Sequence, residues 1–487
     1  MSLLRKSDYA QVPSKVLHEY GACDVIALRK IYPSIKKQLK EQGVDSYYKN
    51  RMKPLVTNLT ISCIRGMHID LNKLDRLSRV VKTALKAYEE ALEEVASEYL
   101  GEEVEFNPRS PVQLRKIIFE GMGLETERRT PTGQMSTDAK AIAEMAEATD
   151  NKFLRDLSEY RKIEKLRSTY IDGLQEYVDE NDYVHPMFKV GFTKSGRSSA
   201  EHPAVTTIPR DKVYNIHGKE VTLKLREIFD VEDGYDMHYM DIKQGELLIA
   251  AILAGENKLV DLACEGEDLH DYAAKACIEN CPVDENGKPL KEARSLAKAV
   301  NFGVIYLATP FGLAQSTGLE VEKIEAFMQK HRKDYPNLWN FLETVGKKAI
   351  ADGHIISPFG RRKNVPPLPA VKSKDDYKTL SYLSHVEREF VNFLPQNGCA
   401  EVMNSAFNRM CTKFTKNPDW DAWPCNLVYD SIQVVGLKKY RKEIKRTMLK
   451  SFLQPIKELD DYILPCSYGV GENWSKAENG AKDYYKF

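Results

Sequence analysis

The chain has 487 residues, of which 71 are Lys or Arg and 71 are Asp or Glu, so its formal net charge is zero. At roughly 150 residues per domain this length suggests about three domains. Its content of 42% hydrophobic and 29% charged residues excludes a disordered or collagen-like chain. Zero net charge does not exclude a nucleic-acid partner, because positive side chains can gather in one cleft.

The longest clean apolar run, residues 247–254, is far shorter than the 20 or so residues that span a bilayer, so we expect no membrane association. The N-terminus also lacks the apolar stretch of a secretory signal. Nine scattered cysteines without a CxxC pair indicate reduced thiols. We therefore expect a cytoplasmic protein (host cytoplasm for a viral protein), with an organelle left open.

The N-terminal 50 residues are predicted to be mostly helical, since apolar residues recur at helical spacing from Tyr20 onward. Nothing before this segment is long enough to form a domain. Residues 1–50 therefore read as the end of a larger unit or as a linker.

The clearest predicted helix covers residues 71–100. Its apolar residues step by three or four, which is the rhythm of one buried stripe; they are Leu74, Leu77, Val81, Ala84, Tyr88, Leu92, Val95 and Tyr99. At about 1.5 Å per residue this helix is a rod of roughly 45 Å, which we expect to pack on a partner helix.

A second helix is predicted to start at Ser110, with Pro111 in its first turn and Gln113 completing a capping box. A turn follows at residues 131–133, and helical spacing then resumes toward Leu166. Four cations in this last stretch are compatible with either a solvated face or a phosphate-gripping arm, and their spacing leaves both open; they are Arg161, Lys162, Lys165 and Arg167.

Beyond about residue 185 shorter strands and helices are predicted. Residues 236–241 form one strand, which leads into a helix near Gln244. Residues 261–380 are largely helical. Residues 426–435 form a hairpin, because two apolar arms flank a polar turn.

Four residues at steps of four define a stripe on one predicted helix: Arg294, Lys298, Phe302 and Tyr306. Two cations followed by two aromatic rings suit a triphosphate with its sugar and base. An amphipathic helix with incidental basic residues is the alternative reading.

Two aspartates stand at the ends of predicted strands, Asp241 and Asp430. Carboxylates from separate strands can bind a pair of divalent metals about 3.5–4 Å apart. Taken alone, each is more often a turn former, so their meaning depends on their neighbours.

Three segments resemble, in order, the polymerase motifs of the family A DNA polymerases, the bacterial polymerase I type with its phage relatives. They are DIKQGELLIAAILAGE (241–256), RSLAKAVNFGVIYLATPFGLA (294–314) and LVYDSIQVV (427–435). Further segments agree with the family in the same order, and together the resemblance covers about residues 50–487. They are residues 106–124 and 159–170 (thumb), 193–210 (primer contact), 266–270 (GEDLH), the RxxxNxxxQ helix from residue 388, and GVGENW (469–474).

The resemblance implies an α+β fold shaped as a right hand, with an antiparallel-sheet palm and helical fingers and thumb. The expected boundaries are an exonuclease-like remnant or linker at 1–50, the palm at 51–72 and 183–260, the thumb at 73–182, the fingers at 261–380, and the C-terminal part of the palm at 381–487.

For the reaction, the resemblance implies that Asp241 and Asp430, with the carbonyl of Ile242, bind two Mg²⁺ ions, for which Mn²⁺ is an alternative. Arg294 and Lys298 hold the dNTP triphosphate, and Lys298 also serves catalysis by protonating the departing pyrophosphate. The further dNTP contacts are Gln244, Glu246, His270, Phe302 and Tyr306. Among these, Glu246 matches the steric gate against ribonucleotides, supported by Tyr306.

Primer–template DNA is the implied macromolecular partner. Arg197, Asn392 and Gln396 are expected to sense base pairing from the minor groove, where correct pairs present acceptors at similar positions. The remaining expected DNA contacts are Arg388, Tyr429, Arg361 and Arg362.

The sequence departs from the family pattern at three places. The third motif reads Tyr429-Asp430-Ser431 where His-Asp-Glu is usual, so one acid is missing. Leu307 replaces the glycine after the finger tyrosine, and Thr206-Thr207 replaces a Gln-Asn pair. The altered third motif best supports the alternative function, a catalytically weakened primer–template binding protein, while Glu246 argues against an RNA-synthesising relative.

Tyr20 and Asp24 resemble the last motif of a proofreading exonuclease, whose earlier motifs do not fit in 19 residues. We therefore expect no proofreading by this chain alone. A separate exonuclease subunit or a processivity factor is an open expectation for its partners.

Overall fold

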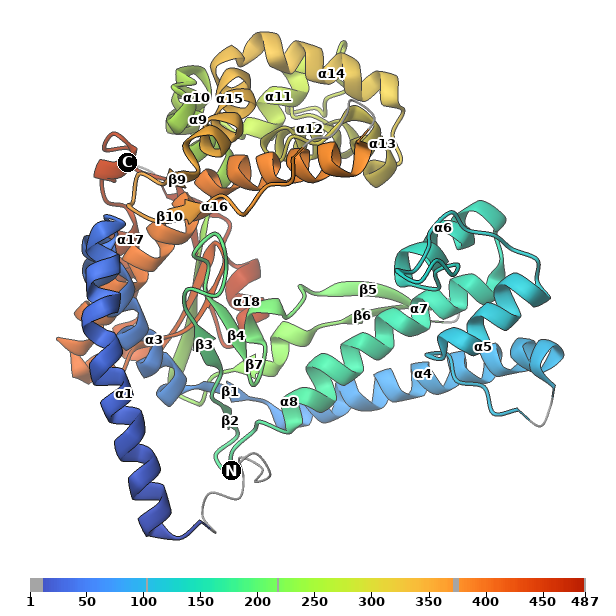
Figure 1. Cartoon of the computed structure of the whole chain (residues 1–487), viewed down its shortest axis with the longest axis horizontal. Coiled ribbons are helices and arrows are strands. Elements are labelled where there is room, and N and C mark those ends of the chain that lie inside the picture. Colours follow the sequence, from blue (N-terminus) through green and yellow to red (C-terminus); the bar gives the residue numbers. More distant parts are fainter. Residues whose placement is uncertain (1–11, 102–103, 217–218, 371–375, 486–487) are drawn as a thin grey trace.

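The computed structural model describes residues 12–101, 104–216, 219–370 and 376–485. Residues 1–11 of the expected N-terminal remnant and 371–375 of the expected fingers lie outside this range. Figure 1 shows a central sheet, a layer of helices above it and a long helical arm to one side.

The central sheet is antiparallel, with strand order β11–β12–β8–β13–β14. Its strands are β8 (Tyr235–Ile242), β11 (Trp423–Val428), β12 (Ser431–Leu437), β13 (Cys466–Gly471) and β14 (Asp483–Tyr485). The predicted strand at 236–241 and the hairpin at 426–435 are both confirmed. β8 lies in the middle with a partner on each side, which is why its side chains are largely buried.

The arm is built on α4 (Leu71–Leu100), which has the predicted bounds. It packs along α7 (Lys152–Leu166), and the apolar faces of the two helices share one core cluster. The other arm helices are α5 (Pro111–Arg115), α6 (Ala139–Thr149) and α8 (Gly173–Gln175). Small antiparallel sheets lie at and near the base of the arm; their strands are β1 (Met67–Ile69), β2 (Tyr183–Val184), β3 (Met187–Lys189), β4 (Ser199–Glu201), β5 (Lys212–Ile216), β6 (Lys219–Leu223) and β7 (Phe229–Asp230).

The predicted cap at Ser110 is confirmed, since its hydroxyl accepts a 3.3 Å hydrogen bond from the Gln113 amide. The predicted return bond of a capping box is wrong. The Gln113 side chain bonds the amide of Asn107 (2.8 Å) and the carbonyl of Glu105 (2.9 Å). The Ser110 amide is already satisfied by the carbonyl of Asn107 at 2.9 Å.

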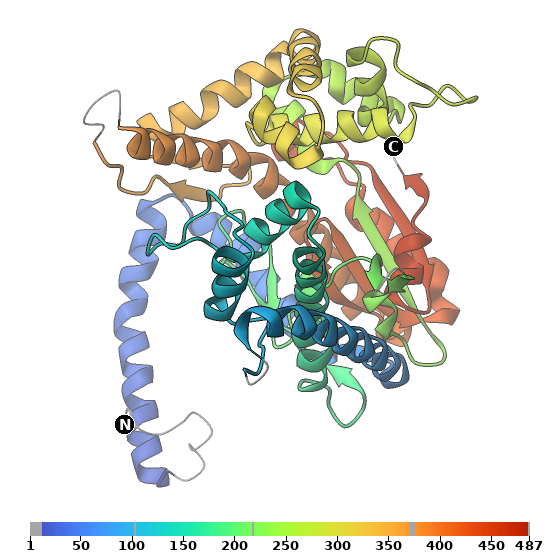
Figure 2. The same ribbon diagram turned by 90° about the vertical axis from the view of Figure 1, so that its right-hand side faces the viewer.

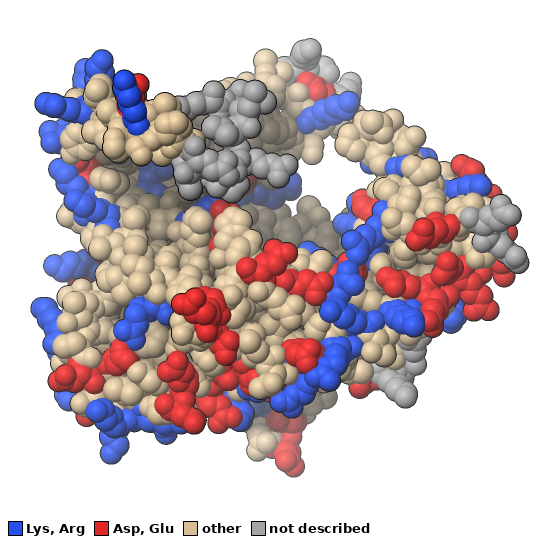
Figure 3. Space-filling view, turned by 90° about the horizontal axis from the view of Figure 1, so that it is seen from below, with Lys and Arg blue, Asp and Glu red and all other residues tan. Residues whose placement is uncertain are grey.

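Three of the four cations on the predicted phosphate-gripping stretch have partners within the arm. Arg161 donates to the carbonyl of Thr137 at 2.6 Å, and Lys162 lies 2.7 Å from Glu159. Arg167 lies 3.1 Å from Glu164. These contacts favour a structural role for them. Figure 3 shows positive and negative side chains interspersed on the lower face of the molecule.

The upper layer consists of helices that lie above the 39-residue α16 (Tyr377–Thr415) in Figure 1. They are α9 (Gly245–Ala254), α10 (Asn257–Glu265), α11 (Leu269–Cys277), α12 (Lys291–Ile305), α13 (Pro310–Thr317), α14 (Val321–Asp334) and α15 (Pro336–Asp352). Between α15 and α16 lies a short hairpin, β9 (His354–Ile356) and β10 (Arg362–Asn364).

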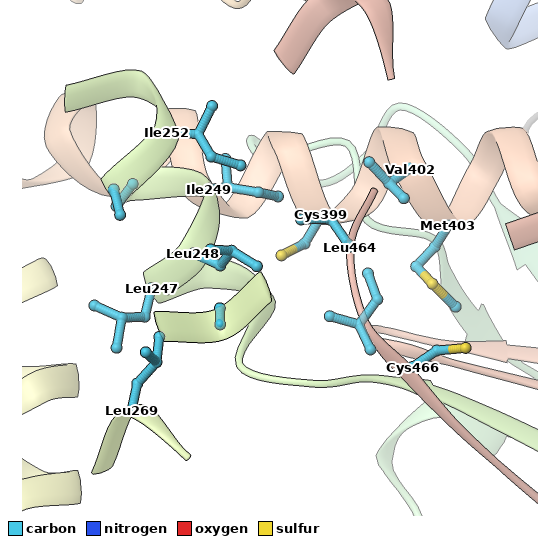
Figure 4. Packing of buried hydrophobic residues seen from close by; sticks show 14 of the residues in the cluster. Leu247, Leu248, Ile249, Ile252, Leu269, Cys399, Val402, Met403, Leu464 and Cys466 are labelled. Carbon is cyan, nitrogen blue, oxygen red and sulfur yellow. The ribbon is translucent and has the colours of Figure 1, made fainter. Parts of the chain in front are cut away.

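Helix α9 is apolar on nearly all sides and therefore buried along most of its length. Figure 4 shows Leu248 and Ile249 beside Cys399 of α16. At Gly398 an added Cβ would meet Ile249 Cγ2 at 2.8 Å, so the two helices approach closely there. This contact fixes α9, and with it the residues that precede α9, against α16.

Helix α1 (Ser14–Glu41) confirms the predicted helical character of this segment and has no buried residue. Its N-terminal part extends away from the body in both Figure 1 and Figure 2. α2 (Asp45–Tyr47) and α3 (Lys53–Arg65) then lead into β1, and α17 (Arg441–Phe452) and α18 (Trp474–Asn479) cover the sheet. In the described residues, none of these helices combines the length and apolarity needed to cross a bilayer.

Candidate active site

A cavity of about 700 Å³ opens between the end of β8, the start of α9 and the exposed face of α12. It brings together most of the residues predicted to bind metal or dNTP. These are Asp241, Ile242, Gln244, Glu246, His270, Arg294, Lys298, Phe302 and Asp430.

The two aspartates are joined through the backbone of the central sheet. Ser431 lies directly opposite Asp241 in the β12–β8 ladder, and Asp430 precedes Ser431 in the hairpin turn. The Ile242 amide donates to the Asp430 carbonyl at 2.9 Å. Sheet register therefore carries both carboxylates to the same end of the sheet, as the strand-end pattern predicts.

The pKa values of both carboxyl groups are raised, so their ionised forms are disfavoured. Burial raises the pKa of Asp241 to about 7, opposed by Lys243 and reinforced by the negative charge of Asp430. Burial also raises the pKa of Asp430, against the nearby Arg197 guanidinium. A positive ligand would offset this cost of desolvation and like-charge repulsion.

The residues present fit a divalent metal pair. Among the described residues Asp430 Oδ1 is buried without a hydrogen-bond partner, and the Arg197 guanidinium lies 3.5 Å from it. Within the described residues no group of three or more His, Cys, Asp or Glu side chains could hold a metal ion. Two carboxylates are nevertheless enough for Mg²⁺, which commonly takes one or two protein carboxylates and completes its shell with substrate phosphates and water.

Position 431, where the family pattern has an acid and this chain has serine, does not face this site. The Ser431 hydroxyl is buried, donates to the Val428 carbonyl at 3.2 Å and accepts from Gln433 at 3.0 Å. Ser431 therefore adds no ligand to the cavity.

Helix α12 presents the predicted cations to the cavity. Val300 and Val304 are buried on its opposite side, so the stripe from Arg294 to Tyr306 faces away from the core. Arg294 is held by Asp268 and Asp271, each 2.7 Å from a guanidinium nitrogen. Lys298 is exposed one turn further along the helix.

The aromatic end of the stripe also meets the cavity. Phe302 lies against the imidazole of His270, with ring centroids 5.5 Å apart and planes tilted by 41°. The amide oxygen of Gln244 accepts from the Leu269 amide at 3.2 Å, so this predicted dNTP contact also ties the cavity floor to α11.

Glu246 is the centre of a buried network. Its carboxylate binds the Arg197 guanidinium on one oxygen and the Tyr306 hydroxyl on the other. Burial, with help from Glu246, raises the pKa of Tyr306 to about 12, so the phenol stays a donor. Arg197 also lies 5.3 Å from the ring of Tyr429. Glu246 is therefore held in one orientation.

The predicted DNA contacts on α16 lie on one helical face. Gln396 reaches the Tyr306 hydroxyl at 3.5 Å. Asn392, one turn earlier, has a buried amide oxygen that finds no hydrogen-bond partner in the part of the chain that the structure describes. Arg388 is half-buried one turn before that. This face adjoins the Glu246 network but does not line the cavity.

The two arginines after α15 lie elsewhere. Arg361 donates to the Tyr47 hydroxyl at 3.0 Å and to the Thr193 carbonyl at 3.1 Å. Arg362 donates to Asn364 at 2.8 Å. Both side chains thus have partners inside the protein, and their predicted role on DNA remains a prediction.

Five charged residues that line the cavity were not predicted from the sequence: Arg210, Lys243, Glu265, Glu267 and Asp268. Arg210 ends the primer-contact segment, and its Nε lies 2.9 Å from Glu478 of α18. Asp268 lies in the quoted segment GEDLH, where its role as N-cap of α11 could have been predicted from its position two residues before His270.

Three residues at the edge of the site have left-handed backbone conformations that side chains disfavour. They are Gln244 (φ 52°), Leu307 (φ 50°) and Tyr429 (φ 50°). Leu307 stands where the family pattern has glycine, and its positive φ explains that preference. Each such residue costs of order 1–2 kcal/mol, which the surrounding packing sustains.

Comparison with solved structures identifies the class of fold. The POL domain of Pol1 from M. smegmatis, in complex with DNA primer-template and dNTP, superposes with a TM-score of 0.79. The match covers 93% of this chain and 75% of that one at 24% identity, which shows the fold alone. The fold is the predicted right hand of palm, fingers and thumb.

Sequence comparison then gives the family. The family model described as DNA polymerase family A matches residues 71–476, and the chain belongs to this family.

Bacterial polymerases are among its curated relatives. DNA polymerase I of Rhizobium leguminosarum is 30% identical over 392 residues, which are 80% of this chain and 36% of that protein. DNA polymerase I of Bacillus subtilis is 26% identical over 480 residues, 98% of this chain and 51% of that protein. The chain thus spans about half, or less, of the length of these relatives.

Proposed function

We propose that this chain is a template-directed DNA polymerase that adds dNTPs to a primer 3′-hydroxyl by two-metal phosphoryl transfer. One observation carries the proposal: Asp241 and Asp430 share a cavity with the cationic face of α12. Membership of DNA polymerase family A supports it. Such a reaction depends mainly on positioning and charge stabilisation, which this pairing of opposite charges provides.

The triphosphate is assigned to α12. Arg294 is already oriented by Asp268 and Asp271, so a phosphate group gains a guanidinium whose side-chain entropy has been lost beforehand. Lys298, exposed in the cavity wall, is assigned as the second phosphate contact and as the proton donor to the departing pyrophosphate.

The metal ligands are assigned to Asp241 and Asp430, with the carbonyl of Ile242. Two Mg²⁺ ions, or Mn²⁺, supply activation of the attacking hydroxyl and stabilisation of the leaving group when bound. The protein's own part is to hold two carboxylates at fixed separation through the sheet.

Selection of deoxyribonucleotides is assigned to Glu246. Arg197 and Tyr306 fix its carboxylate, so it cannot swing aside for a ribose 2′-hydroxyl. Phe302, with His270 behind it, is assigned to the sugar face.

Primer–template DNA is assigned to the space between the arm and the upper layer. We assign the arm as thumb, the upper helices as fingers and the sheet as palm. Arg197, Asn392 and Gln396 are the minor-groove contacts, with Arg388 and Tyr429 beside them. The unpartnered amide oxygen of Asn392 supports this assignment, because a buried polar atom without a partner is costly.

The test is primer extension with dNTPs, with and without Mg²⁺. The parent should extend the primer only with metal, and Asp241→Asn should lose at least about a hundredfold in rate. The matched control is Asp352→Asn, at an exposed residue at the C-terminal end of α15, which should extend normally. Following the primer for shortening also tests the expectation of no proofreading.

The parent and Asp241→Asn also distinguish the proposed polymerase from the alternative, a catalytically weakened primer–template binding protein. A parent that binds the duplex in an anisotropy titration but never extends it would support the alternative. Extension that survives Asp241→Asn would refute the metal assignment.

A further inference from the structure

Three buried side chains form a continuous series of hydrogen bonds that ends at His270. The Trp339 indole N–H lies 3.0 Å from His331 Nδ1, and His331 Nε2 lies 3.1 Å from Asn301 Oδ1. Asn301 Nδ2 lies 3.0 Å from His270 Nδ1. The chain thus runs from the core between α14 and α15 to the wall of the nucleotide cavity.

The direction of the first two bonds follows from chemistry. An indole N–H can only donate, so His331 Nδ1 must accept. A neutral imidazole carries its single proton on the other nitrogen, so His331 Nε2 donates to the oxygen of Asn301. The orientation of the Asn301 amide is therefore dictated by a group two steps away.

A separate contact gives the same orientation for Asn301. Its Nδ2 also lies 3.3 Å from the carbonyl oxygen of Leu269, which can only accept. The amide nitrogen consequently faces His270 Nδ1, and that ring nitrogen accepts. The proton of a neutral His270 is left on Nε2.

The surroundings keep both imidazoles neutral. His331 and Asn301 are each 1% exposed and His270 is 4% exposed. Burial lowers the pKa of His331 to about 3 and that of His270 to about 4.

Three charged groups act on His270: Arg294 and Lys298 disfavour its protonation, whereas Asp268 favours it. On the side of α14, neutral His331 acts on His270 indirectly, through Asn301. Within the described residues His270 Nε2 has no hydrogen-bond partner, and the ring lines the cavity.

We propose that Asn301 and His331 are positioning residues that hold His270 as the neutral Nε2–H tautomer, a fixed donor for a phosphate oxygen of the bound nucleotide. The identity of that ligand rests on the proposed function, whereas the tautomer does not. A neutral donor keeps the same strength through the physiological pH range, and adds no positive charge to retain pyrophosphate.

The direct test is ¹⁵N NMR of the histidine-labelled full chain. The His270 signals are assigned by their loss in His270→Gln. At neutral pH the expected pattern is a protonated Nε2 and an unprotonated Nδ1. An Nδ1–H tautomer or an imidazolium would overturn the proposal, and this measurement needs no substitution at Asn301.

The second test reverses the direction of the hydrogen bond between residue 301 and His270. In Asn301→Asp a carboxylate replaces the amide donor, so the His270 proton should move to Nδ1 and the pKa of His270 should rise. The KM for dNTP should then gain a further pH dependence of roughly tenfold between about pH 6 and pH 8, over and above that of the parent, with kcat changed less.

Two further variants make this result specific. The double variant Asn301→Asp with His270→Gln should lose the pH dependence, because its source has been removed. Asn340→Asp adds the same charge at an exposed residue of α15 and should leave the His270 NMR signals unchanged. A double variant that still titrates would overturn the proposal. Absence of primer extension in a parent with the expected tautomer would instead refute the proposed function.

Discussion

The amide of Ile242 donates a 2.9 Å hydrogen bond to the carbonyl of Asp430. This bond extends the β8–β12 ladder by one step beyond the Asp241–Ser431 pair. The separation of the two carboxylates is therefore set by backbone pairing, which is stiffer than any side-chain contact. A site that must hold two charged groups in register gains from this arrangement.

Asp241→Asn should raise the melting temperature when EDTA is present. The substitution removes one of two desolvated like charges, for a gain of about 1–3 kcal/mol. Mg²⁺ should stabilise the parent, because it binds the folded state, and should no longer stabilise the variant. Thermal denaturation with and without Mg²⁺ measures both effects. Equal Mg²⁺ stabilisation of parent and variant would contradict the metal assignment.

Gly245→Ala should destabilise the fold by about 1–3 kcal/mol, because the new methyl group would collide with Ile242 Cγ2 and lie 2.9 Å from Cys399 Sγ. Gly21→Ala is the control. No atom of the described residues would lie within 4 Å of the new methyl group in α1, so alanine should stabilise the helix by about 0.5–1 kcal/mol. Urea denaturation of the two variants should give opposite signs.

Glu246→Ala should admit ribonucleotides. It removes the carboxylate that Arg197 and Tyr306 hold in place and opens room beside the sugar. We expect the preference for dNTP over rNTP, measured as a ratio of kcat/KM, to fall by at least about tenfold. Glu265→Ala, at another acid of the cavity wall, should keep the preference of the parent. An unchanged ratio in Glu246→Ala would contradict the assignment of Glu246 as the gate against ribonucleotides.

The His68–Asp230 pair should make stability depend on pH. The hydrogen bond that His68 Nδ1 donates to the Asp230 carboxylate, 2.6 Å away, raises the pKa of His68 above its usual 6.5. A raised histidine pKa contributes stability that is complete below about pH 6.5 and is lost as pH rises through the folded-state value. The melting temperature of the parent should therefore fall more between about pH 6 and pH 8 than that of His68→Gln. If the melting temperatures of the parent and His68→Gln change equally with pH, the His68–Asp230 pair contributes nothing to the pH dependence of stability.

Arg361→Ala should lower stability more than duplex affinity. The substitution removes donors to the Tyr47 hydroxyl and the Thr193 carbonyl, at a cost of about 1–3 kcal/mol. Arg362→Ala, whose side chain binds only its near neighbour Asn364 in the described residues, is the comparison and should melt close to the parent. A large loss of duplex affinity with unchanged melting would instead restore the predicted DNA contact for Arg361.

Periodic features were predictable from the sequence. The spacing of apolar residues within each segment was enough to predict the helix at residues 71–100 and the hairpin around Asp430. The pairing of Asp241 with Asp430 across 189 positions needed the family resemblance, because no local pattern encodes which strands become neighbours.

Other features depend on the folded environment alone. The side chain of Gln113 had a nearer partner than its predicted cap, and Arg361 had partners inside the protein. Asn301 and His331 are polar residues on largely helical segments, and only tertiary packing shows that they meet. Buried polar pairs of this kind leave no periodic trace in a sequence.

The left-handed conformations at Gln244, Leu307 and Tyr429 have a consequence for heat inactivation. Each is held only while its neighbours stay packed, so on warming these three turns should relax before the helices of the arm and upper layer melt. Nucleotide incorporation should accordingly cease at a temperature below the midpoint recorded by far-ultraviolet circular dichroism, and brief cooling should restore it.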